Sequence, residues 1–351
     1  MLTNIDNRVT TSLNGPWHII IDPYETGYYD YRLRPSDDGY FRNAKPESPG
    51  DLIEYDFDKS PVLQVPGDWN TQRTDLYYYE GTVWYQRSFA HTPKPARRWF
   101  LYFGAVNYEA IVSVNGELLL THTGGFTPFS VEVTDVLREG DNDVVLKVDN
   151  RRVPEGVPTV NTDWWNYGGI TRRVMLVETP ETHIEETLVR LDPKDPSQVV
   201  AEVVLSDEAS GVPVEFSIPE LDVTVSQETS QEGHALFRVA AAPERWSPSN
   251  PRIYEVVVST PHETLRDRIG FRTIETRGTE ILLNGEPEFL RGISIHEEAP
   301  FGRGRMWNAE DAHTVLQWAK DLGCNYVRLA HYPHNEFMVR EAERMGLLVW
   351  A

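Results

Sequence analysis

Cysteine, long apolar runs and basic residues are all scarce in this sequence of 351 residues. Cys324 is the only cysteine, so no disulfide can form within the chain. No run of eighteen apolar residues occurs, and we expect no membrane contact. Lys and Arg number 33 against 54 Asp and Glu, a net charge of −21. Because such a surface repels phosphate backbones, we expect no nucleic-acid partner.

The sequence does not decide the cellular compartment of the protein. The sequence shows no apolar core of a signal peptide, and 40% hydrophobic with 25% charged residues is typical of a soluble protein. A cytoplasmic protein and a periplasmic one whose leader has been removed fit equally. Aromatic residues reach 11%, with ten Trp and sixteen Tyr. Such rings stack on sugars in carbohydrate-binding proteins, but they also fill the cores of all-β domains.

The length predicts more than one domain, and the first covers residues 1–180. Short alternating runs of apolar and polar residues, broken by Gly, Pro, Asn and Asp, fill this part of the chain. Residues 111–114 and 118–120 flank Asn115-Gly116, which is the preferred dipeptide of a tight hairpin. Residues 142–148 form another strand. Strands of this length and spacing predict a β-sandwich of jelly-roll type.

Residues 181–276 predict a second, smaller β-sandwich. Its strands are expected at 184–191, 199–205, 212–218, 235–240 and 254–259. A unit of about 100 residues with such strands is typical of an immunoglobulin-like sandwich. The Cys and Trp pattern of antibody domains is missing, which excludes that subtype.

Residues 277–351 change to a strand and helix alternation. After a small hairpin around Asn284-Gly285, strands are expected at 292–295, 326–329 and 347–350. Asn308 can cap a helix with an apolar face of Ala312, Val315, Leu316 and Ala319, and Gly346 can end a helix from about residue 335. This order predicts the start of a (β/α)8 barrel. Because a complete barrel needs about 250 residues, we expect the chain to be a fragment or one part of a split assembly.

Six motifs along the chain together resemble one enzyme family. They are VPGDWN at 65–70, GTVWYQR at 81–87, GGFTPF at 124–129, DWWNYGGI at 163–170, RGISIHE at 291–297 and RLAHYP at 328–333. In this order they resemble glycoside hydrolase family 2. The resemblance implies a jelly-roll sugar-binding domain, an immunoglobulin-like domain and a catalytic (β/α)8 barrel. Within the family, the N-terminal motifs look closest to β-glucuronidases, with β-galactosidases next.

His296 and His331 are candidate substrate-binding residues, since each follows a predicted parallel strand. Barrel active sites collect their side chains at those strand ends. An imidazole there can hydrogen-bond to sugar hydroxyls as the ring approaches an oxocarbenium ion. A packed or capping histidine is the structural alternative, and the family motif favours binding. Glu297 and His334 can each bind sugar or orient a neighbour.

Two aspartates complete the candidate substrate-binding residues. The resemblance makes Asp163 the residue that the first domain sends to the active site, among Trp164, Trp165 and Tyr167; in galactosidase relatives it also touches a cation. A turn-forming role is its alternative. Asp68 is a weaker candidate, because glucuronidase-like relatives vary at this position. No cofactor and no metal is expected.

The resemblance implies a retaining exo-β-glycosidase, which uses two carboxyl groups about 5–5.5 Å apart. In the family these are glutamates on later barrel strands, the first within an Asn-Glu pair. Asn335-Glu336 comes too early, and Glu336 is interpreted as charge at a helix N-terminus. We therefore expect the acid/base and the nucleophile beyond Ala351, and no hydrolysis by this chain alone.

The substrate and the assembly remain open at this point. A terminal β-D-glucuronide is the first prediction, a β-galactoside the alternative, and other sugars follow. A non-catalytic carbohydrate-binding fragment or an assembly fragment is also compatible with the β-sandwiches. Because relatives oligomerise, we expect a homo-oligomer of the full-length protein.

Overall fold

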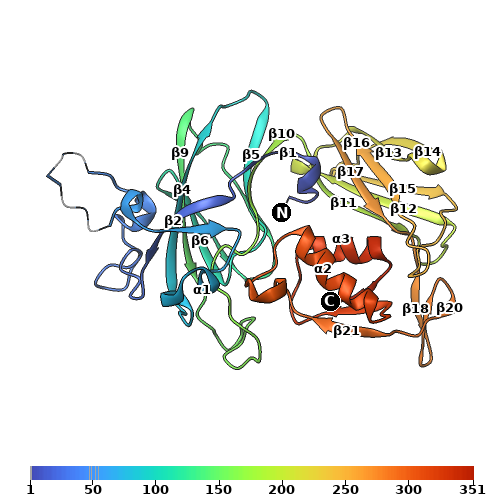
Figure 1. Cartoon of the computed structure of the whole chain (residues 1–351). Coiled ribbons are helices and arrows are strands. Elements are labelled where there is room, and N and C mark those ends of the chain that lie inside the picture. The colour runs from blue at the N-terminus through green and yellow to red at the C-terminus, as the bar shows by residue number, and fades with distance from the viewer. Residues whose placement is uncertain (1, 47, 49, 52, 54) are drawn as a thin grey trace. The chain divides into compact units, whose positions relative to one another are not determined.

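A computed structural model describes residues 2–46, 48, 50–51, 53 and 55–351 (Figure 1). The chain forms two compact units. The first unit contains Thr11–Val177 and Glu297–Asp311, and the second contains Met1–Thr10, Glu178–His296 and Ala312–Ala351. The second unit holds the predicted second domain and most of the third, whereas residues 297–311 of the third belong to the first unit, so the division at residues 180 and 276 stays a prediction.

Two β-sheets build the first unit. The larger sheet is antiparallel in the order β3-β2-β4-β9-β6-β7, and the smaller has the order β1-β10-β5-β8. The strands are β1 (Val9–Ser12), β2 (Gly15–Ile21), β3 (Val62–Val65), β4 (Thr82–His91), β5 (Arg97–Phe103), β6 (Glu109–Val114), β7 (Glu117–Thr123), β8 (Phe129–Glu132), β9 (Gly140–Asp149) and β10 (Val174–Pro180). The predicted hairpin at Asn115-Gly116 is confirmed as the β6–β7 turn, with both residues at positive φ. A short helix, α1 (Trp69–Gln72), follows β3.

The core of the first unit lies between these two sheets. Trp17 and Tyr85 of the larger sheet and Leu101 of the smaller one are fully buried in one apolar cluster. The larger sheet is also covered on its other face, where Trp84 packs with Phe57 and other side chains of the segment before β3. Since neighbouring strand residues point to opposite faces, Val83–Tyr85 of β4 and Val144–Leu146 of β9 are buried on both sides of the sheet, which explains their unbroken apolar runs.

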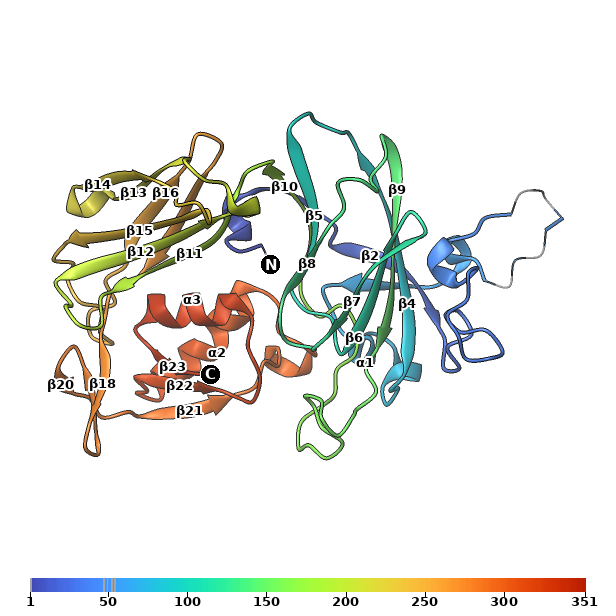
Figure 2. The ribbon, with the colours of Figure 1, turned by 180° about the vertical axis from the view of Figure 1, so that it is seen from behind.

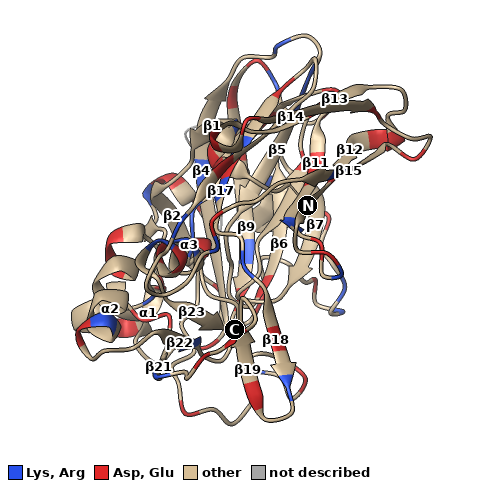
Figure 3. Cartoon of the chain, turned by 90° about the vertical axis from the view of Figure 1, so that its right-hand side faces the viewer, with Lys and Arg blue, Asp and Glu red and all other residues tan. Residues whose placement is uncertain are grey.

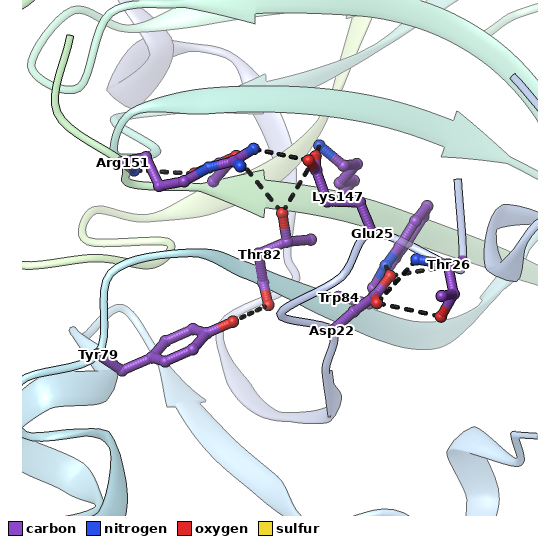
Figure 4. Close-up of polar contacts among 10 residues, drawn as sticks. Asp22, Glu25, Thr26, Tyr79, Thr82, Trp84, Lys147 and Arg151 are labelled. Atoms are coloured by element: carbon purple, nitrogen blue, oxygen red, sulfur yellow. Dashed lines mark hydrogen bonds and ion pairs between the residues drawn. The ribbon is translucent and has the colours of Figure 1, made fainter. Parts of the chain in front are cut away.

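A polar network fixes the turn after β2 (Figure 4). Asp22 accepts hydrogen bonds from the buried Trp84 Nε1 (3.0 Å) and from two backbone amides of the turn. Glu25 pairs with Lys147 Nζ (2.7 Å) and with Arg151 (2.8 Å). Burial works to raise the pKa of Glu25, but the bonds and charges of these two cations outweigh it, and the pKa lies below its ordinary value.

The second unit begins with two sheets that share a core. They have the orders β11-β12-β15 and β14-β13-β16-β17, and Val203, Phe216, Phe237 and Val256 are buried between them. The strands are β11 (Ile184–Leu191), β12 (Gln198–Leu205), β13 (Pro213–Ile218), β14 (Val223–Glu228), β15 (His234–Ala240), β16 (Tyr254–Ser259) and β17 (Thr264–Ile269). All five predicted strands are confirmed. Strands β14 and β17 were not predicted; their side chains are mostly exposed or partly exposed and include several charges.

A small antiparallel sheet connects this sandwich to the α/β segment. It contains β18 (Ile274–Arg277), β19 (Glu280–Leu283) and β20 (Glu286–Pro287). The parallel sheet β21-β22-β23 follows, with helices between its strands (Figure 2). Its elements are β21 (Gly292–Ile295), α2 (Ala309–Asp321), β22 (Tyr326–Leu329), α3 (Glu336–Met345) and β23 (Leu348–Trp350).

Local signals had predicted both helices of this segment. Asn308 Oδ1 accepts from the backbone N–H of Asp311 (2.8 Å) at the start of α2, and the predicted apolar face of that helix is buried. Asn335 caps α3, Glu336 lies in its first turn, and Gly346 ends it at φ 73°. The predicted strand and helix order with a parallel sheet is therefore confirmed. Short 3-10 turns occur at Ile5–Asn7, Tyr40–Arg42, Phe57–Lys59, Thr74–Leu76, Ser206–Glu208, Pro219–Leu221 and Pro300–Gly302.

Acidic residues are found in both units, on strands as well as helices (Figure 3). Among the described residues, none of the helices combines the length and apolar character needed to cross a bilayer.

Candidate active site

The carboxyl ends of β21 and β22 bring two predicted site residues together. His296 follows β21 directly and His331 lies just beyond β22, and their ring centres are 5.2 Å apart at an interplanar angle of 83°. Because the two strands pair in parallel, the residues that follow them emerge at the same edge of the sheet. Tyr332 lies close by, with its ring 6.3 Å from that of His296. Contact of either histidine with a sugar remains a prediction.

His331 is exposed, and one of its nitrogens contacts an arginine. Arg328 Nη2 lies 3.0 Å from His331 Nδ1. A guanidinium can only donate, so Nδ1 is the acceptor and the neutral ring carries its proton on Nε2. The Arg328 guanidinium also lies 5.7 Å from the Trp350 ring centre, so strand β23 supports it. His331 therefore has an Nε2–H available for a ligand hydroxyl.

His334 is built into the same loop differently. It is buried, its Nε2 lies 2.9 Å from the carbonyl oxygen of Ala330, and its ring stacks on Tyr332 at 5.4 Å. Since a carbonyl only accepts, His334 donates through Nε2 and ties the loop to its own start. This arrangement favours the orienting role that the sequence left open for His334.

Glu297 lies in the first unit as the centre of a buried ion cluster. Its side chain is 1% exposed, and Arg172 Nη2 contacts both carboxylate oxygens, at 3.0 and 2.9 Å. Arg305 Nη2 donates to the second oxygen, and the Arg305 guanidinium lies 4.9 Å from the Phe126 ring centre. Both oxygens are thus occupied. Of the two roles left open, the geometry favours Glu297 as a positioning residue.

Asp68 is also buried within the first unit. Its Oδ1 accepts from the Thr71 backbone N–H (2.7 Å), which caps α1, and its Oδ2 accepts from the Arg305 backbone N–H (3.1 Å). Burial, together with the Asp68 charge, raises the pKa of the Tyr85 phenol well above its ordinary value. A Cβ at Gly304 would lie 2.1 Å from Asp68 Oδ2, so only glycine fits beside it. Asp68 therefore links α1 to the 297–311 segment, a structural arrangement.

Asp163 differs from Asp68 and Glu297 because it is exposed. It lies in the loop between β9 and β10, also in the first unit, where Trp164 packs edge-on against Phe126 at 6.0 Å. An exposed carboxylate beside aromatic rings is compatible with binding to vicinal hydroxyls. The role of Asp163 toward a substrate stays a prediction.

Three side chains that hold loops of the first unit in place were not predicted from the sequence. Arg172 and Arg305 neutralise Glu297, and Asn70, only 2% exposed, hydrogen-bonds to two separate loops. Asn70 belongs to the VPGDWN motif, which was a usable signal. The pairing of Arg172 with Glu297 left no signal in the sequence, because the two residues are 125 positions apart in the chain. Among the described residues, no group of three or more His, Cys, Asp or Glu is arranged to hold a metal ion.

Two segments of the chain match models of known protein families. Residues 10–180 match the model described as "Glycosyl hydrolases family 2, sugar binding domain", and residues 274–351 match "Glycosyl hydrolases family 2, TIM barrel domain". The beta-glucuronidase of Rattus norvegicus is 27% identical over 98% of this chain and 56% of the relative. The beta-galactosidase of Thermoanaerobacter pseudethanolicus is 28% identical over 87% of this chain and 44% of the relative.

A solved structure agrees with the sequence relatives. The beta-glucuronidase of an uncultured Clostridium sp. superposes with a TM-score of 0.80 at 26% identity, covering 99% of this chain and 59% of that one. The chain spans about half the length of the curated relatives it matches. Both matched models come from one family, and together they cover most of the sequence. The chain belongs to glycoside hydrolase family 2.

Proposed function

We propose that this chain is part of a retaining exo-β-glycosidase that releases a terminal β-D-glucuronic acid. The observation that carries the proposal is the pair His296 and His331 at neighbouring parallel strand ends, in a chain of this family. Relatives named beta-glucuronidase support the choice of sugar. In this proposal the first sandwich is a jelly roll, the second is immunoglobulin-like, and residues 277–351 start the barrel.

Each candidate residue has its own role in the proposed reaction. His331 donates Nε2–H to a sugar hydroxyl, and that bond strengthens as the ring flattens toward the oxocarbenium ion. His296 binds a second hydroxyl, and Asp163 accepts from others. Glu297 and Asp68 act through position, by fixing the 297–311 segment. Glu336 lies in the first turn of α3, and we assign it to the helix rather than to the reaction. The acid/base and the nucleophile are proposed to be glutamates outside these 351 residues.

A β-galactosidase is the alternative function, favoured by the similarity to the enzyme from Thermoanaerobacter pseudethanolicus. The two sugars differ at C6, where a glucuronide carries a carboxylate. The net charge of −21 gives no long-range attraction for an anionic substrate, so its recognition requires a local cation.

Hydrolysis of matched nitrophenyl glycosides by the complete protein tests the proposal. The β-D-glucuronide should have a kcat/KM well above that of the β-D-galactoside, measured on one enzyme preparation. A clear preference for the galactoside selects the alternative, and hydrolysis of neither contradicts both. Proton NMR of the first product distinguishes a retained β-anomer from an inverted one.

A further inference from the structure

Four aromatic rings gather on one surface of the first unit. Tyr77 and Tyr78 come from the loop after α1, and Trp165 and Tyr167 come from the loop between β9 and β10 (Figure 1). The Trp165 ring centre lies 4.9 Å from Tyr77, 5.6 Å from Tyr78 and 6.4 Å from Tyr167. Tyr78 is 83% exposed and Tyr77 is 43% exposed. These four residues are called the aromatic platform below.

One buried side chain holds both loops of the platform. Asn70 Nδ2 donates to the carbonyl oxygens of Leu76 (3.0 Å) and Tyr77 (3.2 Å). Its Oδ1 accepts from the backbone N–H of Gly168 (2.9 Å). The two loops are almost a hundred residues apart in sequence, and this one amide fixes their spacing.

Further buried amides hold the second loop. Asn166 Nδ2 donates to the carbonyl oxygen of Asn150 (2.7 Å), and Asn107 Nδ2 donates to Asn166 Oδ1 (3.0 Å) and to the carbonyl oxygen of Tyr167. Asn107, Asn150 and Asn166 are each at most 3% exposed. Because buried polar groups hold the backbone, little ordering entropy is lost when a ligand contacts the rings.

The chemistry of the platform matches a sugar ring. Ring faces offer apolar contact area, while three phenol groups and one indole N–H lie at the edges as hydrogen-bonding groups. Asp163, in the same loop as Trp165, adds an exposed carboxylate. A pyranose has the complementary surface, with C–H groups on its faces and hydroxyls around its rim. None of the four platform residues is a cation, and the net charge of −21 gives no attraction for an anionic ligand, so a neutral sugar fits better.

We propose that the aromatic platform binds a neutral, β-linked pyranose with equatorial hydroxyls. A planar aromatic compound is the competing occupant, and it would leave the phenol and carboxylate groups around the rings unused.

Saturation-transfer NMR with cellopentaose on the 351-residue chain tests the proposal. Cellopentaose is neutral and β-linked, and all its ring hydroxyls are equatorial. Tyr78→Ala and Trp165→Ala each remove one stacking ring, and each should weaken the binding of cellopentaose about tenfold. Tyr24→Ala is the matched control, since Tyr24 is an 86% exposed tyrosine of the same unit outside the platform, and binding should stay within about twofold. The high exposure of Tyr78 means that its removal should leave the unfolding midpoint unchanged.

Three results would overturn the proposal: no saturation transfer to cellopentaose, equal binding by Tyr78→Ala and Tyr24→Ala, or platform-dependent binding of 4-methylumbelliferone without binding of cellopentaose. The last would assign the platform to planar aromatic compounds instead. Because this measurement needs no turnover, its failure leaves the glycosidase proposal standing. Conversely, an inactive complete protein would leave a positive binding result intact.

Discussion

Removal of the Glu297 carboxylate should strongly destabilise the first unit. In Glu297→Ala, Arg172 and Arg305 lose their anion while their side chains are only 5% and 4% exposed. Arg172 also donates from Nη1 to the carbonyl oxygens of Phe126 (2.9 Å) and Gly104 (3.5 Å). Neutral carbonyl groups cannot replace a carboxylate. In Glu297→Ala the two guanidinium charges therefore stay buried without the negative charge of Glu297.

The expected magnitude follows from that burial. Breaking a buried ion pair by removing one partner typically costs about 3–5 kcal/mol. In a unit of this size each kcal/mol lowers the unfolding midpoint by about 2–4 °C, so a fall of about 10 °C is expected. The loss should be smaller in a double variant that also carries Arg305→Met, because one of the two buried positive charges is then gone.

Scanning calorimetry measures this loss, and hydrogen exchange of residues 297–311 assigns it to the first unit. Glu132→Ala is the matched control. Arg98 donates two hydrogen bonds to Glu132, at 3.0 and 2.7 Å, but these side chains are 24% and 38% exposed. An exposed pair contributes about 0–1 kcal/mol. If Glu297→Ala loses no more stability than Glu132→Ala, the reasoning about the buried cluster is refuted.

Four further variants probe other parts of the molecule. Gly168→Ala should cost about 1–3 kcal/mol or more in thermal unfolding, because a Cβ there would lie 2.1 Å from the buried Trp69 ring; an unchanged midpoint would contradict this. Glu25→Gln should lower the free energy of unfolding at neutral pH. The pKa of Glu25 is lower in the folded state than its ordinary value of 4.5, so its charge stabilises the fold above pH 4.5, and the difference in stability from the unchanged chain should disappear as the pH falls below that value. A difference that persists in acid would exclude the ion pairs as its cause. In the complete enzyme, His331→Ala should lower kcat about 10²–10³-fold with an unchanged midpoint, whereas His334→Ala should chiefly lower the midpoint. Near-normal kcat in the first variant would make His331 a structural residue.

Local signals let the sequence determine most of the secondary structure. Asn308 and Gly346 set helix ends through contacts within a few residues, and Asn115-Gly116 set a hairpin through its own backbone preferences. The strand-end positions of His296 and His331 followed equally, since a strand, a helix and a parallel strand bring the carboxyl ends to one edge. These features depend on short-range interactions that a sequence pattern contains.

Only the tertiary structure decided the surroundings of the candidate carboxylates. Glu297 and Asp68 have the same chemistry as Asp163 in the sequence, but the fold buries the first two among partners and leaves the third exposed. Arg172, one partner of Glu297, lies 125 residues away, and the Asp68 contact with Arg305 spans 237 residues. The aromatic platform likewise depends on Asn70 meeting a loop 98 residues along the chain. A spacing in sequence says nothing about such pairs, because packing across the sheets and loops selects them.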